Sequence, residues 1–180
     1  MQAKAEIRKQ MRGIRKSAEV AGLSDRILCR LKPLIRDYSS FFIYVSAGKE
    51  VGTQRLMEEL LLQGKLVTVP KVIGERIMRP AIISSLDELC VPVFGYKEPA
   101  HSNFYFGSID VCIVPGVAFS EDGWRLGNGK GYYDKFLSEN PTLKIALAYE
   151  FQVLPEIPHE PHDVKMDYIV TQMRVICAKK

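Results

Sequence analysis

The chain has few cysteines for its 180 residues, and none of them forms a CxxC pair. The four are Cys29, Cys90, Cys112 and Cys177. A disulfide framework or a zinc ribbon needs closely spaced cysteines, so this scatter argues against both and favours reduced thiols in a cytosolic protein. Cys112 lies in an apolar run, and we interpret it as a small core residue.

The sequence also has no run of about 18 apolar residues, which argues against a membrane span. Charged residues interrupt its first twelve positions, so it lacks the apolar stretch of a signal peptide. We expect a cytoplasmic protein without a membrane partner. With 47% hydrophobic and 26% charged residues, and no repeat or linker, we expect a single domain over residues 1–180 and a monomer.

The common nucleotide-binding motifs are missing, although residues 125–134 form a glycine-rich run, Arg-Leu-Gly-Asn-Gly-Lys-Gly-Tyr-Tyr-Asp. The Walker loop needs Ser or Thr after its lysine, whereas Lys130 precedes Gly131. The dinucleotide and protein-kinase loops need the spacing GxGxxG, whereas this run has GxGxG. These three motif classes are therefore excluded.

The run could still bind phosphate. Successive N–H groups in a glycine-rich turn form a concave anion site, which Arg125 and Lys130 would reinforce with full charges. Asp134 offers a hard oxygen ligand for a magnesium ion on a polyphosphate. The alternative is a tight turn entering a helix, with Lys130 and Asp134 in a surface ion pair of about 0.3–0.5 kcal/mol.

Positive charge is concentrated near the N-terminus, where residues 1–36 carry ten Lys or Arg against three Asp or Glu. Apolar residues recur at helical spacing from Ala3 to Ile14, and a basic stripe borders them. The stripe consists of Lys4, Arg8, Arg12 and Arg15. Such a region suits either a nucleic-acid arm or a cationic wall for a small polyanion, and no RNA-binding motif favours the first. We interpret Arg12 and Arg15 as a solvated face.

Helical and strand patterns alternate along the rest of the chain. We expect helices over residues 3–18, from a Ser24 cap to about 35, over 53–63 and in a loop-to-helix transition over 129–137. Strands are expected over 41–45, 66–69 (ending at Pro70), 77–83 (an edge strand), 111–114, 145–148 and 168–170. This order predicts an α/β fold, a three-layer sandwich with a mainly parallel sheet flanked by helices.

Ligands bind beyond the carboxyl ends of strands in such sheets. Glu50, the loop 115–134 and residues 150–152 each follow an expected strand, so one cleft could collect all three.

Together with Val114-Pro-Gly-Val-Ala-Phe119, the 125–134 run resembles the signature of the 5-formyltetrahydrofolate cyclo-ligase family, also called 5,10-methenyltetrahydrofolate synthetase. Weaker similarities follow in the family's order along nearly the whole chain. They are Lys4 and Arg8, Glu50-Val-Gly-Thr53, Pro70-Lys71, Gln152, His162-Asp163 and Asp167–Thr171. Gly52 departs from the family, which usually has an aspartate there.

The resemblance implies an ATP- and Mg²⁺-dependent ligase of one-carbon metabolism that cyclises 5-formyltetrahydrofolate to 5,10-methenyltetrahydrofolate and releases ADP and phosphate. Arg125 and Lys130 would be catalytic, and Asp134 and Asp163 would hold the metal. Val45, Glu50, Tyr132 and Tyr133 would bind the folate. ATP would be bound by Lys4, Arg8, Arg125, Gly127, Asn128, Gly129, Lys130, Gly131, Tyr132, Tyr133 and Asp163. Its partners would be small molecules rather than nucleic acid.

Two other functions stay open. Related α/β folds host sugar-phosphate isomerases and CoA-transferase-like enzymes, which would not need ATP. A nucleic-acid-binding module using the basic N-terminal region would bind more weakly at high salt. His159 and His162 suggest zinc, but Pro158 and Pro161 disfavour a helix there and no further soft ligand is placed. Trp124 is interpreted as a packed loop aromatic rather than a ligand contact.

Overall fold

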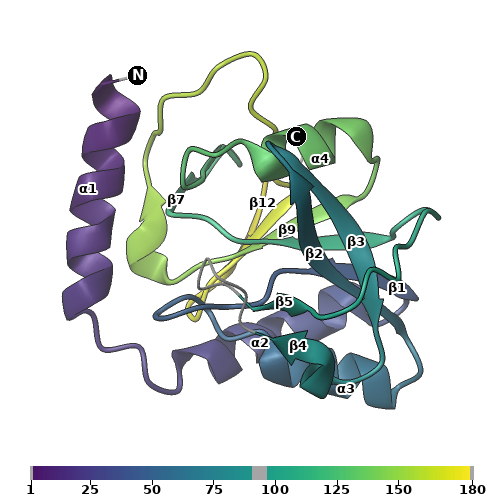
Figure 1. Ribbon diagram of the computed structural model, residues 1–180. Coiled ribbons are helices and arrows are strands. Elements are labelled where there is room, and N and C mark those ends of the chain that lie inside the picture. The colour runs from purple at the N-terminus through teal and green to yellow at the C-terminus, as the bar shows by residue number, and fades with distance from the viewer. Residues whose placement is uncertain (1, 91–96, 179–180) are drawn as a thin grey trace.

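The computed structural model describes residues 2–90 and 97–178, and its centre is a seven-stranded sheet (Figure 1). The strand order is β12-β11-β9-β6-β1-β2-β3. The strands are β1 Ser40–Ile43, β2 Leu66–Gly74, β3 Ile77–Ile83, β6 Val111–Val114, β9 Leu143–Leu147, β11 Tyr168–Val170 and β12 Val175–Cys177. The four inner pairings are parallel, and only the outermost two, β11 with β12 and β2 with β3, are antiparallel.

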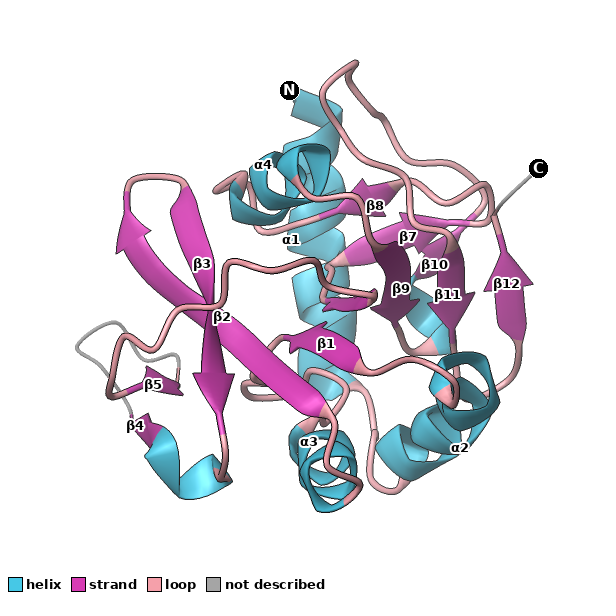
Figure 2. Ribbon diagram, turned by 90° about the vertical axis from the view of Figure 1, so that its right-hand side faces the viewer, coloured by secondary structure: helices cyan, strands magenta, loops and turns pink. Residues whose placement is uncertain are grey.

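Helices cover both faces of this sheet, because successive residues of a strand point to opposite faces. In β1, Phe41 and Ile43 belong to the core beneath α2 (Leu23–Ile35) and α3 (Gln54–Leu62). Phe42 faces the other way and packs on Phe136 of α4 (Tyr132–Glu139), with ring centroids 4.5 Å apart. Figure 2 shows α2 and α3 on the opposite side of the sheet from α4. The expected three-layer sandwich is confirmed.

A second, three-stranded sheet was not expected from the sequence. It contains β7 Ala118–Ser120, β8 Arg125–Leu126 and β10 Val153–Leu154 in the order β10-β7-β8. Helix α1 (Gln2–Ser17) packs beside this small sheet through the buried Met11 and the half-buried Ile7 (Figure 1). Strands of two or three residues are too short to show periodicity. The sequence therefore did not predict that the first two residues of the 125–134 run form strand β8.

Strand β2 continues through Pro70, where the sequence predicted its end. Its pairing with β1 extends only to Thr68, so later residues need no N–H on that side. On the other side Pro70 lies opposite Pro80 of the edge strand β3. Antiparallel pairs alternate between hydrogen-bonded and non-hydrogen-bonded sites, and two prolines can face each other at the second kind.

The expected Ser24 cap is also wrong. Helix α2 begins after Gly22, which has a left-handed φ of 70°. Ser24 lies in the first turn, where its hydroxyl accepts a hydrogen bond from the backbone N–H of Gly52 at 2.9 Å. The serine therefore ties α2 to the loop that precedes α3, rather than capping its own helix. The remaining short elements are β4 Leu89–Cys90, β5 Glu98–Pro99 and two 3₁₀ turns at Leu86–Glu88 and Glu150–Gln152.

No helix within the described ranges is long and apolar enough to cross a membrane.

Candidate active site

A cavity of about 400 Å³ opens beyond the carboxyl ends of β1 and β6, where the sequence predicted a cleft. Every site residue singled out in the sequence lines it. These are Lys4, Arg8, Val45, Glu50, Arg125, Gly127, Asn128, Gly129, Lys130, Gly131, Tyr132, Tyr133, Asp134 and Asp163. Of the three expected pieces, Glu50 and the 115–134 loop meet here. The third does not, because the described lining includes neither Glu150 nor Gln152.

The glycine loop forms one wall of the cavity, and arginines lie against it. Gly129 and Gly131 have φ values of 92° and 71°, which side chains with a Cβ rarely adopt. A Cβ on Gly127 would lie 2.6 Å from Arg125 Nη1, and one on Gly129 would lie 3.4 Å from Arg8 Cζ. The loop therefore needs glycine both for its turn and for the close approach of guanidinium groups.

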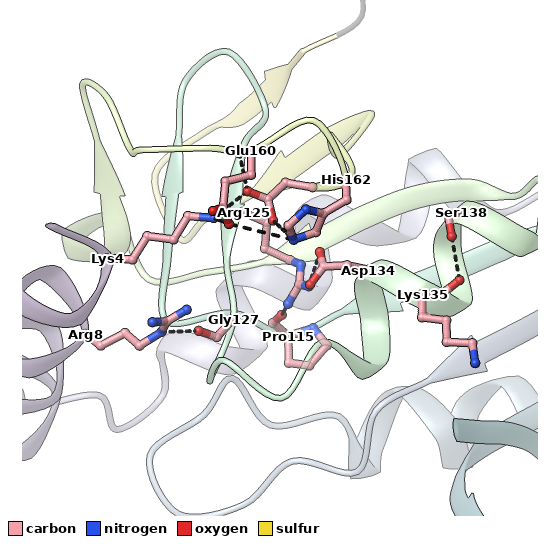
Figure 3. Close-up of polar contacts among 11 residues, drawn as sticks. Lys4, Arg8, Pro115, Arg125, Gly127, Asp134, Lys135, Ser138, Glu160 and His162 are labelled. Carbon is pink, nitrogen blue, oxygen red and sulfur yellow. Dashed lines mark hydrogen bonds and ion pairs between the residues drawn. The ribbon is translucent and has the colours of Figure 1, made fainter. Parts of the chain in front are cut away.

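Arg125 is held at the centre of this wall by neighbours from two other segments. Its Nη1 donates to the Pro115 carbonyl at 3.3 Å, and its Nη2 donates to Asp134 Oδ1 at 2.8 Å (Figure 3). The alternative of a simple tight turn expected a surface ion pair between Lys130 and Asp134. The described contacts contain no such pair, since Asp134 pairs with Arg125. The buried Nε of Arg125 has no hydrogen-bond partner in the described part of the chain.

Helix α1 brings two more cations to the cavity. Lys4 Nζ lies 2.6 Å from Asp163 Oδ2 and 2.9 Å from Glu160 Oε2 (Figure 3). Burial alone would lower the pKa of Lys4, but the hydrogen bonds to the two carboxylates outweigh it and raise the pKa. Arg8 Nε donates to the Gly127 carbonyl at 2.8 Å, which leaves its terminal nitrogens available to a ligand.

Glu50 also lines the cavity. Its Oε2 accepts a hydrogen bond from the Ala47 N–H at 3.0 Å. Burial raises the pKa of Glu50, because desolvation disfavours the charged form. Burial also raises the pKa of Tyr133 well above its usual value, and the phenol oxygen of Tyr133 has no partner among the described residues. A ligand with a donor-rich edge could bond to the Glu50 carboxylate.

Arg15 does not lie on the solvated face predicted for it. Its Nη2 donates to the Gly116 carbonyl at 2.8 Å, and the buried Gln152 amide donates to the same oxygen at 3.0 Å. Gly116 lines the cavity, so the hydrogen bonds from Arg15 and Gln152 fix the position of a segment of the cavity wall. Helical geometry could have distinguished Arg15 from Arg12 in the sequence. At about 100° per residue, Arg15, eleven residues after Lys4, lies within about 20° of Lys4 around the helix axis. The exposed Arg12, eight residues after Lys4, lies about 80° away.

Oxygen ligands for a divalent cation lie at one side of the cavity. Asp134 Oδ1 pairs with Arg125 and Asp163 Oδ2 pairs with Lys4, and the other oxygen of each carboxylate makes no hydrogen bond within the described residues. Asp163 Oδ1 lies 3.9 Å from His162 Nε2. Hard carboxylate oxygens of this kind suit Mg²⁺. Glu160, His162 and Asp163 also have potential ligand atoms within 4.8 Å of one another, but the Lys4 ammonium already contacts both carboxylates. That arrangement disfavours a zinc site.

Trp124 packs away from the cavity, in agreement with its interpretation as a loop aromatic. Its ring stacks on His159 at a centroid distance of 3.8 Å, and Lys165 Nζ lies 4.7 Å from its centroid. Gly52 is likewise not among the described lining residues. A Cβ there would approach no atom closer than 3.5 Å, so the departure from the family's aspartate leaves the cavity wall unchanged.

Comparison with known proteins shows the family of the chain. Residues 1–172 match the model of the 5-formyltetrahydrofolate cyclo-ligase family. A probable 5-formyltetrahydrofolate cyclo-ligase of Caenorhabditis elegans is 33% identical over 150 residues, covering 74% of this chain and 73% of the relative. One from Schizosaccharomyces pombe is 34% identical over 146 residues, covering 71% and 72%.

Solved structures give the same result. The chain is similar to the 5,10-methenyltetrahydrofolate synthetase of Aquifex aeolicus, with a TM-score of 0.87 and 32% identity over 98% of this chain and 93% of that one. A synthetase from Mycoplasma pneumoniae shares the fold with a TM-score of 0.74 and 24% identity, covering 94% and 98%. The chain belongs to the 5-formyltetrahydrofolate cyclo-ligase family.

Proposed function

We propose that this cyclo-ligase uses ATP and Mg²⁺ to close 5-formyltetrahydrofolate into 5,10-methenyltetrahydrofolate, with release of ADP and phosphate. One observation carries the proposal. A single cavity is lined both by a glycine loop with Arg8, Arg125 and Lys130 and by the partly desolvated Glu50. A polyphosphate suits the loop and its cations, and the donor-rich aminopyrimidine edge of a folate suits the carboxylate.

The chemistry needs a leaving group. The formyl oxygen of the substrate attacks the γ-phosphorus of ATP, and the bond to the bridging β–γ oxygen breaks to release ADP. N10 then attacks the activated formyl carbon and loses its proton, and the former formyl oxygen departs with the phosphate. Such a step depends on positioning and charge stabilisation rather than on a protein nucleophile.

The residues have separate tasks in this proposal. Arg125 and Lys130 stabilise the charge on the transferring phosphoryl group. Lys4 and Arg8 close the nucleotide end, with the loop N–H groups from Gly127 to Gly131 beneath the phosphates. Val45, Tyr132 and Tyr133 line the cavity together with Glu50 and would contact the folate. Asn128 completes the loop.

Asp134 and Asp163 would hold Mg²⁺, which when bound supplies positive charge that screens the phosphate oxygens. Their existing ion pairs fit that task, since Arg125 and Lys4 orient one oxygen of each carboxylate and leave the other available.

The proposal is tested by following formation of the conjugated methenyl bridge by absorbance, with purified protein, 5-formyltetrahydrofolate, ATP and Mg²⁺. Product should form only when both ATP and Mg²⁺ are present. K130A should lose most of the turnover, at least about a hundredfold if Lys130 stabilises the transition state. K135A removes the same charge from an exposed position of α4 outside the described cavity lining and should retain it. Turnover without ATP, or equal turnover in the two variants, would contradict the proposal.

A further inference from the structure

The turn between β2 and β3 contains an arginine that no motif includes. Arg76 has a φ of 55°, and no other described non-glycine residue has a positive φ. Both strands of this hairpin also reach the cavity, through Val72 on β2 and Met78 on β3. The hairpin tip lies beside the first turn of α4 in Figure 1. Arg76 therefore extends from an element that already forms part of the cavity wall.

The side chain of Arg76 lies against the glycine loop. A Cβ on Gly131 would stand 2.8 Å from Arg76 Nη2 and 3.1 Å from its Nε. Gly127 and Gly129 are approached in the same way by Arg125 and Arg8. Each of the three alternate glycines thus has one guanidinium group against it, supplied by β8, α1 and the β2–β3 turn. The GxGxG spacing is explained by this arrangement.

Three of the cations at the loop are not paired with a carboxylate among the described residues. Arg125 pairs with Asp134, but Arg76, Arg8 and Lys130 have no ion-pair partner within residues 2–90 and 97–178. Bringing like charges to one loop is unfavourable unless an anion joins them. A triphosphate on the loop would supply that anion, and the planar fork of a guanidinium suits phosphate oxygens.

We infer that Arg76 is a third arginine of the nucleotide site, which binds the polyphosphate of ATP from the Gly131 end of the loop. The inference rests on the proposed function, because ATP is the anion that the cavity is proposed to bind. Binding of ATP then also fixes the β2–β3 hairpin against α4, so the nucleotide orders a wall of the cavity.

The test is calorimetric titration of the purified full-length protein with ATP. R76G removes the charge, and glycine accepts a positive φ without strain, so the fold is preserved. R79A is the matched control: Arg79 is on the same hairpin, is exposed, and lies 5.5 Å from the ring centroid of Phe106 instead of at the loop. We expect R76G to raise the Kd for ATP roughly tenfold, R79A to change it less than twofold, and R76K to recover part of the loss.

The outcomes separate the two proposals. If the wild-type protein binds ATP and R76G binds it equally well, the role of Arg76 is refuted while the proposed function stands. If R79A weakens ATP binding as much as R76G, only the general charge of the hairpin matters and the specific role is likewise refuted. If the wild-type protein binds no ATP, the proposed function fails and the inference fails with it. The Kd for 5-formyltetrahydrofolate should be unchanged in R76G.

Discussion

At the scale of single residues, Glu50 shows how a site is maintained at a cost in stability. Burial raises its pKa, so the folded state holds a proton on this carboxyl more tightly than the unfolded chain does. The stability that Glu50 contributes is fully present below the usual glutamate pKa of about 4.3 and is lost as the pH rises through the raised value. Above its raised pKa the ionised Glu50 side chain therefore makes the folded state less stable.

E50Q should bind folate less well and yet unfold at a higher temperature. Loss of a charged acceptor costs about 1.5–3 kcal/mol, or about 10- to 100-fold in the KM for 5-formyltetrahydrofolate, with the KM for ATP nearly unchanged. Thermal unfolding followed by circular dichroism should place E50Q above the wild type at pH 7, with a gap that closes towards pH 4. E58Q, which changes an exposed glutamate of α3, should alter neither property. An unchanged folate KM in E50Q would remove Glu50 from the substrate site.

Ten of the 23 described lining residues come from one continuous string, which the sequence marks by its glycines. The basic stripe and the expected strand ends indicated Lys4 and Glu50, whereas Asp163 needed the family resemblance. Arg15 and Arg76 were not found, because their roles depend on what packs opposite them. A single arginine in a turn matches no sequence motif, and only the structure shows that Arg76 lies against Gly131.

At the scale of elements, helix α1 links three separate parts of the site along one edge. Lys4 contacts Asp163, Arg8 contacts Gly127 and Arg15 contacts Gly116. These three residues recur near one angular position, beside the buried Met11. The positive charge of Arg15 also lowers the pKa of Glu50 against the effect of burial. The helix therefore orders both ends of the cavity.

R15Q should loosen this arrangement. Loss of one charge-assisted bond to a backbone carbonyl is worth about 1.5 kcal/mol, and we expect the KM for 5-formyltetrahydrofolate to rise roughly three- to tenfold. R12Q removes the same charge four residues from Arg8, on the exposed side of α1, and should behave like the wild type. Steady-state kinetics on both variants decides the matter. Equal kinetics for R15Q and R12Q would show that the contact between Arg15 and Gly116 does not contribute to substrate binding.

The elements themselves were predictable where periodicity is long. Helix α1 and strands β3, β6 and β11 have the expected bounds within a residue or so. The errors arose where pairing overrides local preference. Pro70 does not end β2, because the pairing with β1 stops at Thr68 and Pro70 faces Pro80 on the other side. The strands of the second sheet are too short for their periodicity to be recognised in the sequence. Ser24 has the chemistry of a cap, but the neighbouring loop at Gly52 uses its hydroxyl instead.

At the scale of the whole molecule, four segments that are distant in sequence meet at the cavity. They are α1, the β2–β3 hairpin, the glycine loop and the segment that carries Asp163. A ligand bound there joins them, and any ligand that binds only the folded state stabilises it by mass action. Arg8, Arg76 and Lys130, which have no carboxylate partner among the described residues, should make this stabilisation large for ATP.

Saturating ATP should therefore raise the unfolding temperature. At a concentration one hundred times Kd the gain is about 2.7 kcal/mol, which for a protein of this size corresponds to roughly 5–10 °C. Differential scanning fluorimetry measures the shift, and adenosine, which lacks the phosphates, should give far less. The shift should also shrink as salt is added, since exposed cations such as Lys130 are screened. A shift equal for ATP and adenosine would show that the cations do not bind the nucleotide, because the energy would then come from the base and sugar alone.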